Sequence, residues 1–319
     1  MKITVLNAAT IGKDLSMAPL SAFGEVAVYD KTEKEEVSSR VCDADVLIIN
    51  KLTCNEETLK DAKRLKLICL SATGYDNVDL AYCRKRGIAV CNVVGYSTDS
   101  VAQLTLSMVL ALATNLVSYR DFVASGSYTK SGLANALTPV FHELCGKTWG
   151  IFGYGNIGKK VAAVADAMGC RVIVCKKNKT DEVYPVVSFE ELCKESDILT
   201  VHAPLSPQTR GIFDAEHLAL MKKDAILVNV ARGALFDEAA VALAVKNGTI
   251  GGFGCDVYTK EPFAADHPYT ALLDDPRVIL TPHMAWGAYE ARVRCLQEIC
   301  KNIEAFLKGE RRCRVDLLG

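Results

Sequence analysis

The sequence has almost no net charge and no strongly charged run that would direct it to a polyanion. Its 37 basic and 38 acidic side chains leave a formal net charge of −1 over 319 residues. Nucleic acids and anionic membrane surfaces attract proteins through an excess of positive charge, which this composition does not supply. We therefore expect no nucleic acid and no membrane as partners, and a small soluble molecule is favoured.

The sequence also lacks the cysteine patterns of disulfide scaffolds and metal sites. Its 13 cysteines are odd in number and scattered, and no Cys-x-x-Cys occurs. Most lie in apolar runs, as Cys69, Cys91, Cys175 and Cys255 do, which is typical of reduced thiols that serve as small core residues. We predict no metal site, and a reducing compartment, the cytoplasm, as the location.

Long hydrophobic runs are scarce. The N-terminal segment 1–7 is too short an apolar stretch for a signal peptide. The stretch 101–119 is uncharged and long enough to cross a membrane, but polar side chains such as Gln103, Thr105 and Asn115 interrupt it. We predict instead one helix buried between domains or subunits. A two-fold homodimer is the commonest assembly that buries such a surface.

What is present is an alternation of strand and helix patterns. In residues 1–92 we expect strands at 3–7, 26–29, 46–50, 67–71 and 88–92, with helices at 33–41, 56–64 and 78–86. Gly24 and Gly87 stand where helices should stop before the next strand. Nearly unbroken apolar strands between amphipathic helices predict a parallel sheet covered on both faces.

A second alternation begins at Lys147. Its expected strands are 148–152, 171–175, 198–202, 225–230, 252–257 and 278–281. Ser188 with Glu191 has the spacing of a capping box, and Asp214 and Asp237 are candidate N-caps of two further helices. The last helix, 289–307, would most economically return to the first sheet. We therefore predict one domain of residues 1–98 plus 289–319 and an inserted domain of residues 99–288.

A glycine-rich turn joins the strand 148–152 to a helix expected at 159–168. In such a turn Gly153 permits the tight bend, Gly155 lets the backbone approach a pyrophosphate, and Gly158 lets the helix pack on the strand. The helix N-terminus then offers N–H groups and a positive dipole to the phosphates. The pattern predicts an α/β chain of two doubly wound domains, a Rossmann dinucleotide-binding domain inserted into a smaller flavodoxin-like one. The turn itself, Gly153, Tyr154, Gly155, Asn156, Ile157 and Gly158, is expected to contact the cofactor.

Three side chains that could do chemistry follow three of these strands. Arg232, Glu261 and His283 each come shortly after a predicted strand of the inserted domain, where ligands of doubly wound sheets bind. Taken singly, each has an ordinary explanation: a surface ion pair, a solvated carboxylate and a loop histidine. Together they suit the oxidation of an alcohol by a nicotinamide, because a histidine can exchange the hydroxyl proton and an adjacent carboxylate favours its imidazolium form. The guanidinium can hold a substrate carboxylate at two points.

The motifs resemble those of the D-isomer-specific 2-hydroxyacid dehydrogenases over nearly the whole chain. Besides the glycine-rich turn they are the segments 202–210, 228–233, 254–257, Glu261-Pro262 and Thr281-Pro-His283. Thr73-Gly-Tyr75 and His283-Met-Ala-Trp286 are most similar to the glycerate dehydrogenase, or hydroxypyruvate reductase, group.

The resemblance implies a role for each matching residue. His283 would be the acid and base, Glu261 its partner, and Arg232 a substrate ligand, while Asp256 would lie beside the nicotinamide carboxamide. Thr73, Gly74 and Tyr75 would bind the substrate carboxylate through backbone N–H groups, and Trp286 would also contact the substrate. Further cofactor contacts are expected from His202, Pro204, Thr209, Val230, Ala231, Arg232 and His283.

One departure from the family concerns the choice between NAD(H) and NADP(H). In members that prefer NAD an acidic residue ends the strand after the glycine-rich turn, whereas here the strand 171–175 continues into Lys176-Lys177-Asn178-Lys179. A carboxylate would repel a 2′-phosphate, and ammonium groups could attract one. We therefore expect NADP(H) to be used well, with NAD(H) beside a solvated lysine cluster as the alternative.

The sequence thus predicts a cytoplasmic oxidoreductase that interconverts a small 2-keto acid and its D-2-hydroxy acid. Hydroxypyruvate or glyoxylate, reduced to D-glycerate or glycolate, is the expected substrate. Two alternatives stay open at this point: a dinucleotide-sensing binding protein of the same fold, and a family dehydrogenase for another 2-keto acid.

Overall fold

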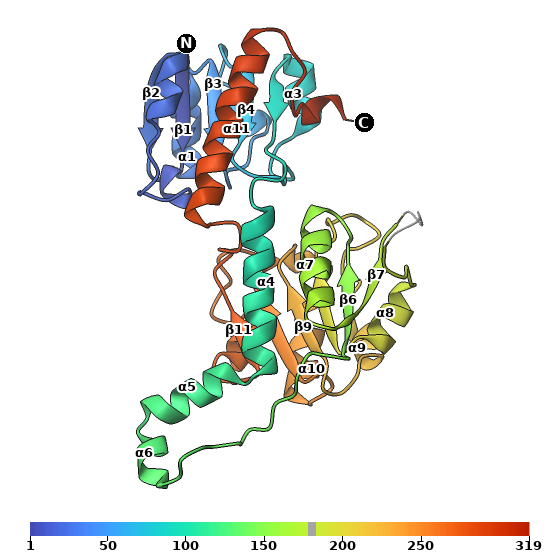
Figure 1. Cartoon of the computed structure of the whole chain (residues 1–319). Helices are drawn as coiled ribbons and strands as arrows, with labels where there is room; N and C mark the ends of the chain where they lie inside the picture. Colours follow the sequence, from blue (N-terminus) through green and yellow to red (C-terminus); the bar gives the residue numbers. More distant parts are fainter. Residues whose placement is uncertain (178–182, 319) are drawn as a thin grey trace. The chain divides into compact units, whose positions relative to one another are not determined.

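The computed structural model describes residues 1–177 and 183–318. It divides the chain into two compact units, Met1–Ser97 with Gly287–Gly319 and Thr98–Trp286, which we call the first and second domain. The fold class predicted from the sequence is confirmed, since each domain is built on a parallel sheet with helices between its strands (Figure 1).

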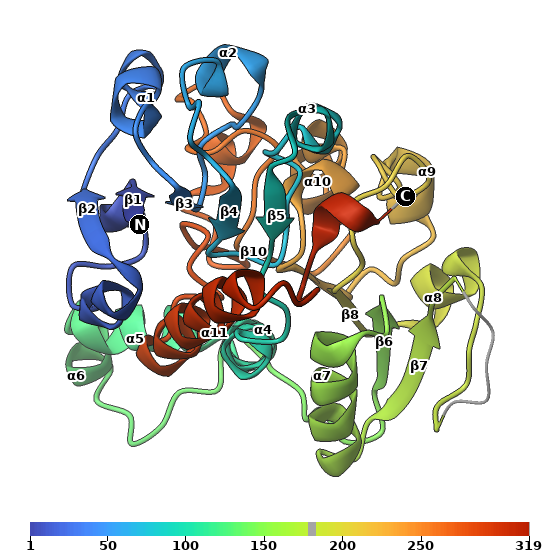
Figure 2. The ribbon, with the colours of Figure 1, turned by 90° about the horizontal axis from the view of Figure 1, so that it is seen from above.

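The first domain contains a five-stranded parallel sheet in the order β2-β1-β3-β4-β5, seen in sequence in Figure 2. Its central strands β3 and β4 are apolar and buried along their whole length, as a sheet covered on both faces requires. The order is that of flavodoxin-like folds. The strands are β1 (Lys2–Leu6), β2 (Glu25–Tyr29), β3 (Val46–Ile49), β4 (Leu67–Leu70) and β5 (Ala89–Cys91).

Four α-helices belong to this domain: α1 (Lys34–Val41), α2 (Glu56–Leu59), α3 (Leu80–Arg86) and α11 (Tyr289–Leu307). Gly87 ends α3 in a left-handed conformation, with φ 67°, as predicted. The prediction of a helix over 56–64 is wrong beyond Leu59. There the N–H of Ala62 bonds to the carbonyl of Leu59, so tight turns replace the helical pattern.

The second domain contains a six-stranded parallel sheet in the order β11-β10-β9-β8-β6-β7. Side chains alternate along β6: Trp149 and Ile151 face the core formed with α4 and α7, and Phe152 faces the opposite core. The strand order reverses at β6, which is the position where such sheets bind ligands. The strands are β6 (Thr148–Phe152), β7 (Arg171–Cys175), β8 (Ile198–Val201), β9 (Ile226–Asn229), β10 (Gly252–Cys255) and β11 (Val278–Leu280).

The helices of the second domain are α4 (Thr98–Ala113), α5 (Leu116–Ala124), α6 (Ser127–Ser131), α7 (Asn156–Ala167), α8 (Phe189–Glu195), α9 (Ala215–Ala219) and α10 (Glu238–Lys246). The predicted caps are confirmed. Ser188 accepts from the N–H of Glu191 in a capping box, and Asp214 and Asp237 cap α9 and α10.

The prediction of one helix through 101–119 is wrong. The chain breaks after Ala113 and bends by 66° into α5. Asn115 adopts a left-handed conformation with φ 51°, which asparagine tolerates better than most residues, and its side-chain amide donates to the carbonyl of Val140. The buried side chains of α4 pack into the core of their own domain, while α5 buries none.

No single helix among the described residues has both the length and the apolar composition to cross a membrane. The bent pair α4–α5 meets both criteria only when its two helices are counted together. All 13 cysteines lie in the described part of the chain and are free thiols. Within residues 1–177 and 183–318, no three His, Cys, Asp or Glu side chains form a group that could hold a metal ion.

Candidate active site

The glycine-rich turn between β6 and α7 forms an open cradle. A Cβ at Gly153, where φ is 96°, would lie 2.3 Å from the backbone nitrogen of Ala203, and one at Gly158 would lie 2.2 Å from the carbonyl oxygen of Gly153. These two glycines are therefore required by the protein itself. At Gly155, in contrast, a Cβ would have no described residue within 4 Å, and no side chain in the described part of the chain caps the helix that begins there. This cradle fits the pyrophosphate of a dinucleotide, which would occupy the space left at Gly155.

The other candidate residues follow neighbouring strands of the same sheet. His202 follows β8, Arg232 follows β9, Glu261 follows β10 and His283 follows β11. Because β8, β9, β10 and β11 are parallel neighbours, their carboxyl ends meet at the edge of the sheet that also carries the cradle.

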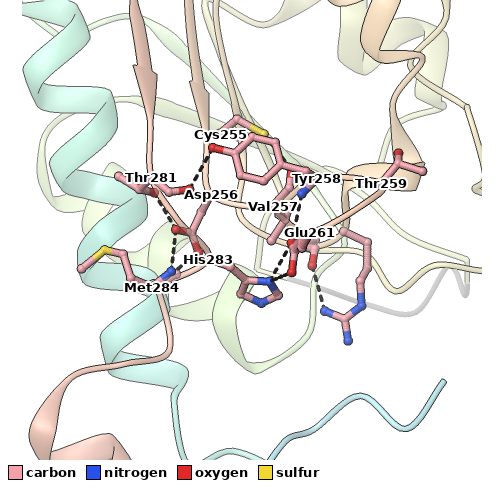
Figure 3. A network of polar contacts seen from close by, with 12 residues as sticks. Cys255, Asp256, Val257, Tyr258, Thr259, Glu261, Thr281, His283 and Met284 are labelled. Atoms are coloured by element: carbon pink, nitrogen blue, oxygen red, sulfur yellow. Dashed lines mark hydrogen bonds and ion pairs between the residues drawn. The ribbon is translucent and has the colours of Figure 1, made fainter. Parts of the chain in front are cut away.

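Glu261 and His283 form a hydrogen-bonded pair (Figure 3). Nδ1 of His283 lies 2.6 Å from Oε2 and 2.8 Å from Oε1 of Glu261. The side chain of His283 is 22% exposed and that of Glu261 is 26% exposed, so the pair is accessible to a ligand and still partly shielded from water. Because a carboxylate only accepts, Nδ1 carries a proton, and Nε2 is the nitrogen that can exchange one with a substrate.

The turn that carries His283 is held by a buried carboxylate. Asp256, at the end of β10, is fully buried and accepts hydrogen bonds from the hydroxyl of Thr281 and the backbone N–H groups of Met284 and Ala285. Between these contacts His283 adopts φ 53°, a conformation that residues other than glycine rarely take. Burial raises the pKa of Asp256, against the lowering effect of the three hydrogen bonds. The protein itself therefore uses Asp256 to fix the His283 turn.

The loop that carries Arg232 is held by Asn229, a buried amide at the end of β9. Its side chain accepts from the N–H of Ala231 at 3.0 Å and donates to the carbonyl of Arg232 at 2.9 Å. The next residue, Gly233, lies so close to the Glu261 loop that a Cβ would be 2.1 Å from the carbonyl carbon of Tyr258. Any side chain at Gly233 would separate the loops of Arg232 and Glu261.

The remaining predicted cofactor residues lie in loops that follow β7, β8 and β9, strands of the same sheet as β6. The backbone of His202 and Ala203 abuts Gly153. Nε2 of His202 contacts Oγ1 of Thr200 at 3.1 Å, its Nδ1 is buried without a partner among the described residues, and burial lowers its pKa to about 3. Thr209 bonds to the carbonyl of Pro204 and fixes the shape of that exposed loop. Val230 and Ala231 lie in the loop after β9, and Lys176 and Lys177 directly follow β7. Asn178 and Lys179 lie outside the described residues.

The predicted substrate residues lie in both domains. Thr73, Gly74 and Tyr75 follow β4 in the first domain, where the hydroxyl of Thr73 donates to the carbonyl of Val93. Trp286 is the last residue of the second domain and packs partly buried on the α4 and α7 core.

Sequence reasoning missed two residues that build this site. Asn229 could have been noticed as a polar residue in the otherwise apolar strand Ile226–Asn229. Tyr258 has no comparable signal: its N–H donates to Glu261 at 3.1 Å, and its hydroxyl donates to the carbonyl of Thr281 at 2.9 Å. It therefore ties the Glu261 loop to the segment that leads into His283.

Comparison with known proteins agrees with this geometry. Residues 106–285 match the family model described as "D-isomer specific 2-hydroxyacid dehydrogenase, NAD binding domain". A glycerate dehydrogenase of Methylorubrum extorquens is 38% identical over 290 residues, which cover 90% of this chain and 90% of that protein.

Two solved structures extend the match to the whole fold. An acyclic imino acid reductase in complex with NADPH and D-Arg superposes with a TM-score of 0.87 at 29% identity, covering 99% of this chain and 100% of that one. D-lactate dehydrogenase from Aquifex aeolicus, complexed with NAD and lactic acid, gives a TM-score of 0.82 at 28% identity, covering 97% and 96%. Since the family model spans more than half of the chain and its relatives span nearly all of it, this protein belongs to the D-isomer-specific 2-hydroxyacid dehydrogenases.

Proposed function

We propose that this oxidoreductase reduces hydroxypyruvate or glyoxylate to D-glycerate or glycolate. The observation that carries the proposal is the pairing of His283 with Glu261 at the sheet edge that also holds the dinucleotide cradle. The similarity to a glycerate dehydrogenase supports the choice of a small, hydroxylated substrate.

In this reaction a reduced nicotinamide held by the cradle would supply a hydride to the carbonyl carbon. His283 gives the proton of Nε2 to the carbonyl oxygen, and Glu261 stabilises the imidazolium that must exist before this transfer. Arg232 would hold the substrate carboxylate with its planar guanidinium and polarise the carbonyl. Thr73, Gly74 and Tyr75 would add backbone N–H groups for the same carboxylate, and Trp286 would bound the substrate pocket. Asp256 would lie beside the nicotinamide carboxamide, and His202, Pro204 and Thr209 beside the cofactor.

The function is tested by following the oxidation of NADH and NADPH with hydroxypyruvate, glyoxylate and pyruvate. We expect turnover of the first two, and loss of turnover with retained cofactor binding in a His283→Ala variant. Cofactor binding without turnover of any 2-keto acid would instead identify a dinucleotide-sensing binding protein. Preference for a bulkier 2-keto acid would identify a different dehydrogenase of the family.

For the cofactor we propose that NADP(H) is used well. The carbonyl of Cys175, at the end of β7, accepts the N–H of Gly153 at 2.9 Å, so Lys176 follows directly at the cradle. Lys177 is exposed, and an ammonium group there can meet a 2′-phosphate. Measurement of kcat/KM with both cofactors tests the proposal, and a tenfold or greater preference for NADH would contradict it.

We also propose a homodimer formed through the segment 114–145. Helix α5 buries no residue, and Leu133, Leu137 and Val140 are 66%, 73% and 70% exposed. In Figure 1, α5 and α6 extend away from the sheet of their domain. Beside α5 an apolar groove of about 260 Å³ is lined by Val117, Leu272, Leu273, Val278, Ile279 and Leu280. A second copy of the chain could cover both surfaces. Sedimentation should give a dimer that Leu137→Glu weakens, and a monomer in the native protein would overturn this assignment.

The free thiols favour a reducing compartment, and we propose the cytoplasm. Fractionation of cells that express the tagged chain would test this location.

A further inference from the structure

A second histidine–glutamate pair lies behind the loop that carries Glu261. Nε2 of His267 is 3.0 Å from Oε2 of Glu238, and the two side chains are only 9% and 14% exposed. Glu238 is the first residue of α10, and His267 caps the 3₁₀ helix Pro268–Leu272. The pair therefore joins two elements on either side of the Glu261 loop.

The remaining polar atoms of the pair bind two backbone N–H groups, one in the Glu261 loop and one in the 3₁₀ helix that follows it. Oε1 of Glu238 accepts the N–H of Thr259 at 2.8 Å, and Nδ1 of His267 accepts the N–H of Tyr269 at 3.2 Å. Because Nδ1 accepts a hydrogen bond, it carries no proton. The ring proton is therefore on Nε2, which donates a hydrogen bond to Glu238. Each atom thus has one partner, and the tautomer of His267 is fixed.

The Glu238–His267 pair binds the chain one residue after the peptide N–H that donates to Glu261. The N–H of Tyr258 donates to Glu261, and the N–H of the following residue, Thr259, donates to Glu238. Figure 3 shows Tyr258 and Thr259 on the chain segment between Asp256 and Glu261. Two consecutive N–H groups are therefore bound by two different carboxylates. Any rotation of this backbone that releases Glu238 also moves the donor of Glu261.

The tip of the loop, Lys260, Glu261 and Pro262, is exposed as a whole, although the side chain of Glu261 is only 26% exposed. The anchors are on either side: the ring of His267 packs against Phe263 at 4.9 Å and against Tyr258 at 6.0 Å between centroids. The segment that Glu238 and His267 hold therefore leads directly into the exposed tip that carries Glu261.

We propose that Glu238 and His267 are positioning residues for the Glu261–His283 pair. They hold the Tyr258–Thr259 backbone in the orientation that presents Glu261 to Nδ1 of His283. This assignment rests on the proposed function, in which Glu261 and His283 perform the acid–base step.

Two substitutions at His267 separate its two hydrogen bonds. His267→Asn keeps a short acceptor for the N–H of Tyr269 but cannot reach Glu238, whereas His267→Gln can still donate to Glu238 but loses the cap. We expect the asparagine variant to lower kcat by about tenfold with the KM for cofactor unchanged, and the glutamine variant to restore most of it. In Glu238→Gln the NH₂ group of the amide must face the N–H of either Thr259 or His267, so one of the two hydrogen bonds is lost. This variant should therefore resemble the asparagine variant.

The matched control is His217→Asn in the same domain. Nδ1 of His217 bonds to Asp214 at 2.8 Å near the start of α9, and neither residue contacts the Glu261 loop in the described structure. This variant replaces the imidazole of a histidine–carboxylate pair of similar length, so it can change thermal stability, but we expect kcat to stay at the native value.

A readout independent of turnover is the low-field proton resonance of the Nδ1–H of His283 bonded to Glu261, assigned by its loss in His283→Gln. We expect this resonance to broaden or shift in His267→Asn and Glu238→Gln, and to persist in His217→Asn. Folded His267→Asn and Glu238→Gln proteins with native kcat and an unchanged resonance would overturn the proposal. If the native protein turns over no 2-keto acid, the proposed function fails, and the resonance still decides whether the pair positions Glu261.

Discussion

Substitutions in the glycine cradle should distinguish glycines needed for the packing of the protein from a glycine needed for cofactor binding. Gly155→Ala places a methyl group where no atom of residues 1–177 or 183–318 lies within 4 Å. The backbone there has φ −87° and ψ −161°, which alanine adopts without strain. Alanine is a poorer helix cap than glycine by roughly 0.5–1 kcal/mol, and it restricts the unfolded chain by a similar amount. The two effects offset each other, so the melting temperature should change by less than about 2 °C.

Gly158→Ala should behave in the opposite way. Its methyl group would lie 2.2 Å from the carbonyl oxygen of Gly153, about 1 Å inside an ordinary contact. The helix or the strand must shift, at a cost of roughly 1–3 kcal/mol, which lowers the melting temperature by roughly 2–10 °C. The gain in helix propensity, up to about 1 kcal/mol, does not compensate.

Both variants are compared by thermal unfolding without cofactor and by fluorescence titration with reduced cofactor. Gly155→Ala should weaken cofactor binding at least tenfold, or about 1.4 kcal/mol, because its methyl group would occupy the position that we propose for the pyrophosphate. Unchanged affinity in this variant would refute the cradle as the phosphate site. A Gly158→Ala protein as stable as the native one would refute the packing argument.

Four further predictions concern the residues around the site. His283→Ala should lower kcat by roughly 10²–10⁴-fold while cofactor titrations remain native, and near-normal turnover would remove His283 from the mechanism. Arg232→Ala should raise KM and lower kcat together, and an unchanged KM would contradict its substrate role. Gly233→Ala should lower kcat by about 10²-fold, since it pushes the Arg232 and Glu261 loops apart; Gly252→Ala, whose Cβ would meet its nearest neighbour at an ordinary 3.4 Å, is the control. Burial lowers the pKa of His202 to about 3, so the unfolded chain binds a proton between about pH 6.5 and 3 that the folded chain does not. The free energy of unfolding should therefore fall by about 1 kcal/mol more between pH 7 and 5.5 in the native protein than in His202→Gln. Urea titrations at both pH values measure this free energy, and an equal fall in the two proteins would contradict the prediction.

The strands were predictable because each is a short apolar run between turn or capping residues. The bounds of β6 and β7 agree with the prediction to the residue. Strands β1 and β2 each begin one residue earlier than predicted, and the other strands are one or two residues shorter than predicted. The break between α4 and α5 was not predictable from hydrophobicity, since the stretch is apolar on both sides of Asn115. Its cause is a backbone conformation and a bond to Val140, which lies far along the chain.

The sequence predicted the site residues whose side chains are reactive, and it did not predict the residues that position them through backbone groups. Glu261 and His283 could be paired because parallel neighbouring strands bring their ends together. The role of Asp256 in holding the His283 turn was not visible, because it depends on N–H groups of Met284 and Ala285 rather than on any side-chain pattern. The same holds for Tyr258, whose two hydrogen bonds use a backbone N–H and a backbone carbonyl as partners.

Helix α11 has a consequence for the order in which the protein folds during synthesis. The amide of Asn302 donates to the carbonyl of Asn92, Arg294 donates to the carbonyl of Tyr96, and Asp316 accepts the N–H of Val90 in β5. These partners leave the ribosome after the entire second domain has been made. Because domains fold as units once their residues are available, the contiguous second domain can fold on the ribosome first. The N-terminal sheet, although synthesised earliest, therefore gains its contacts with α11 last, and until then the apolar side chains that α11 covers stay exposed to solvent.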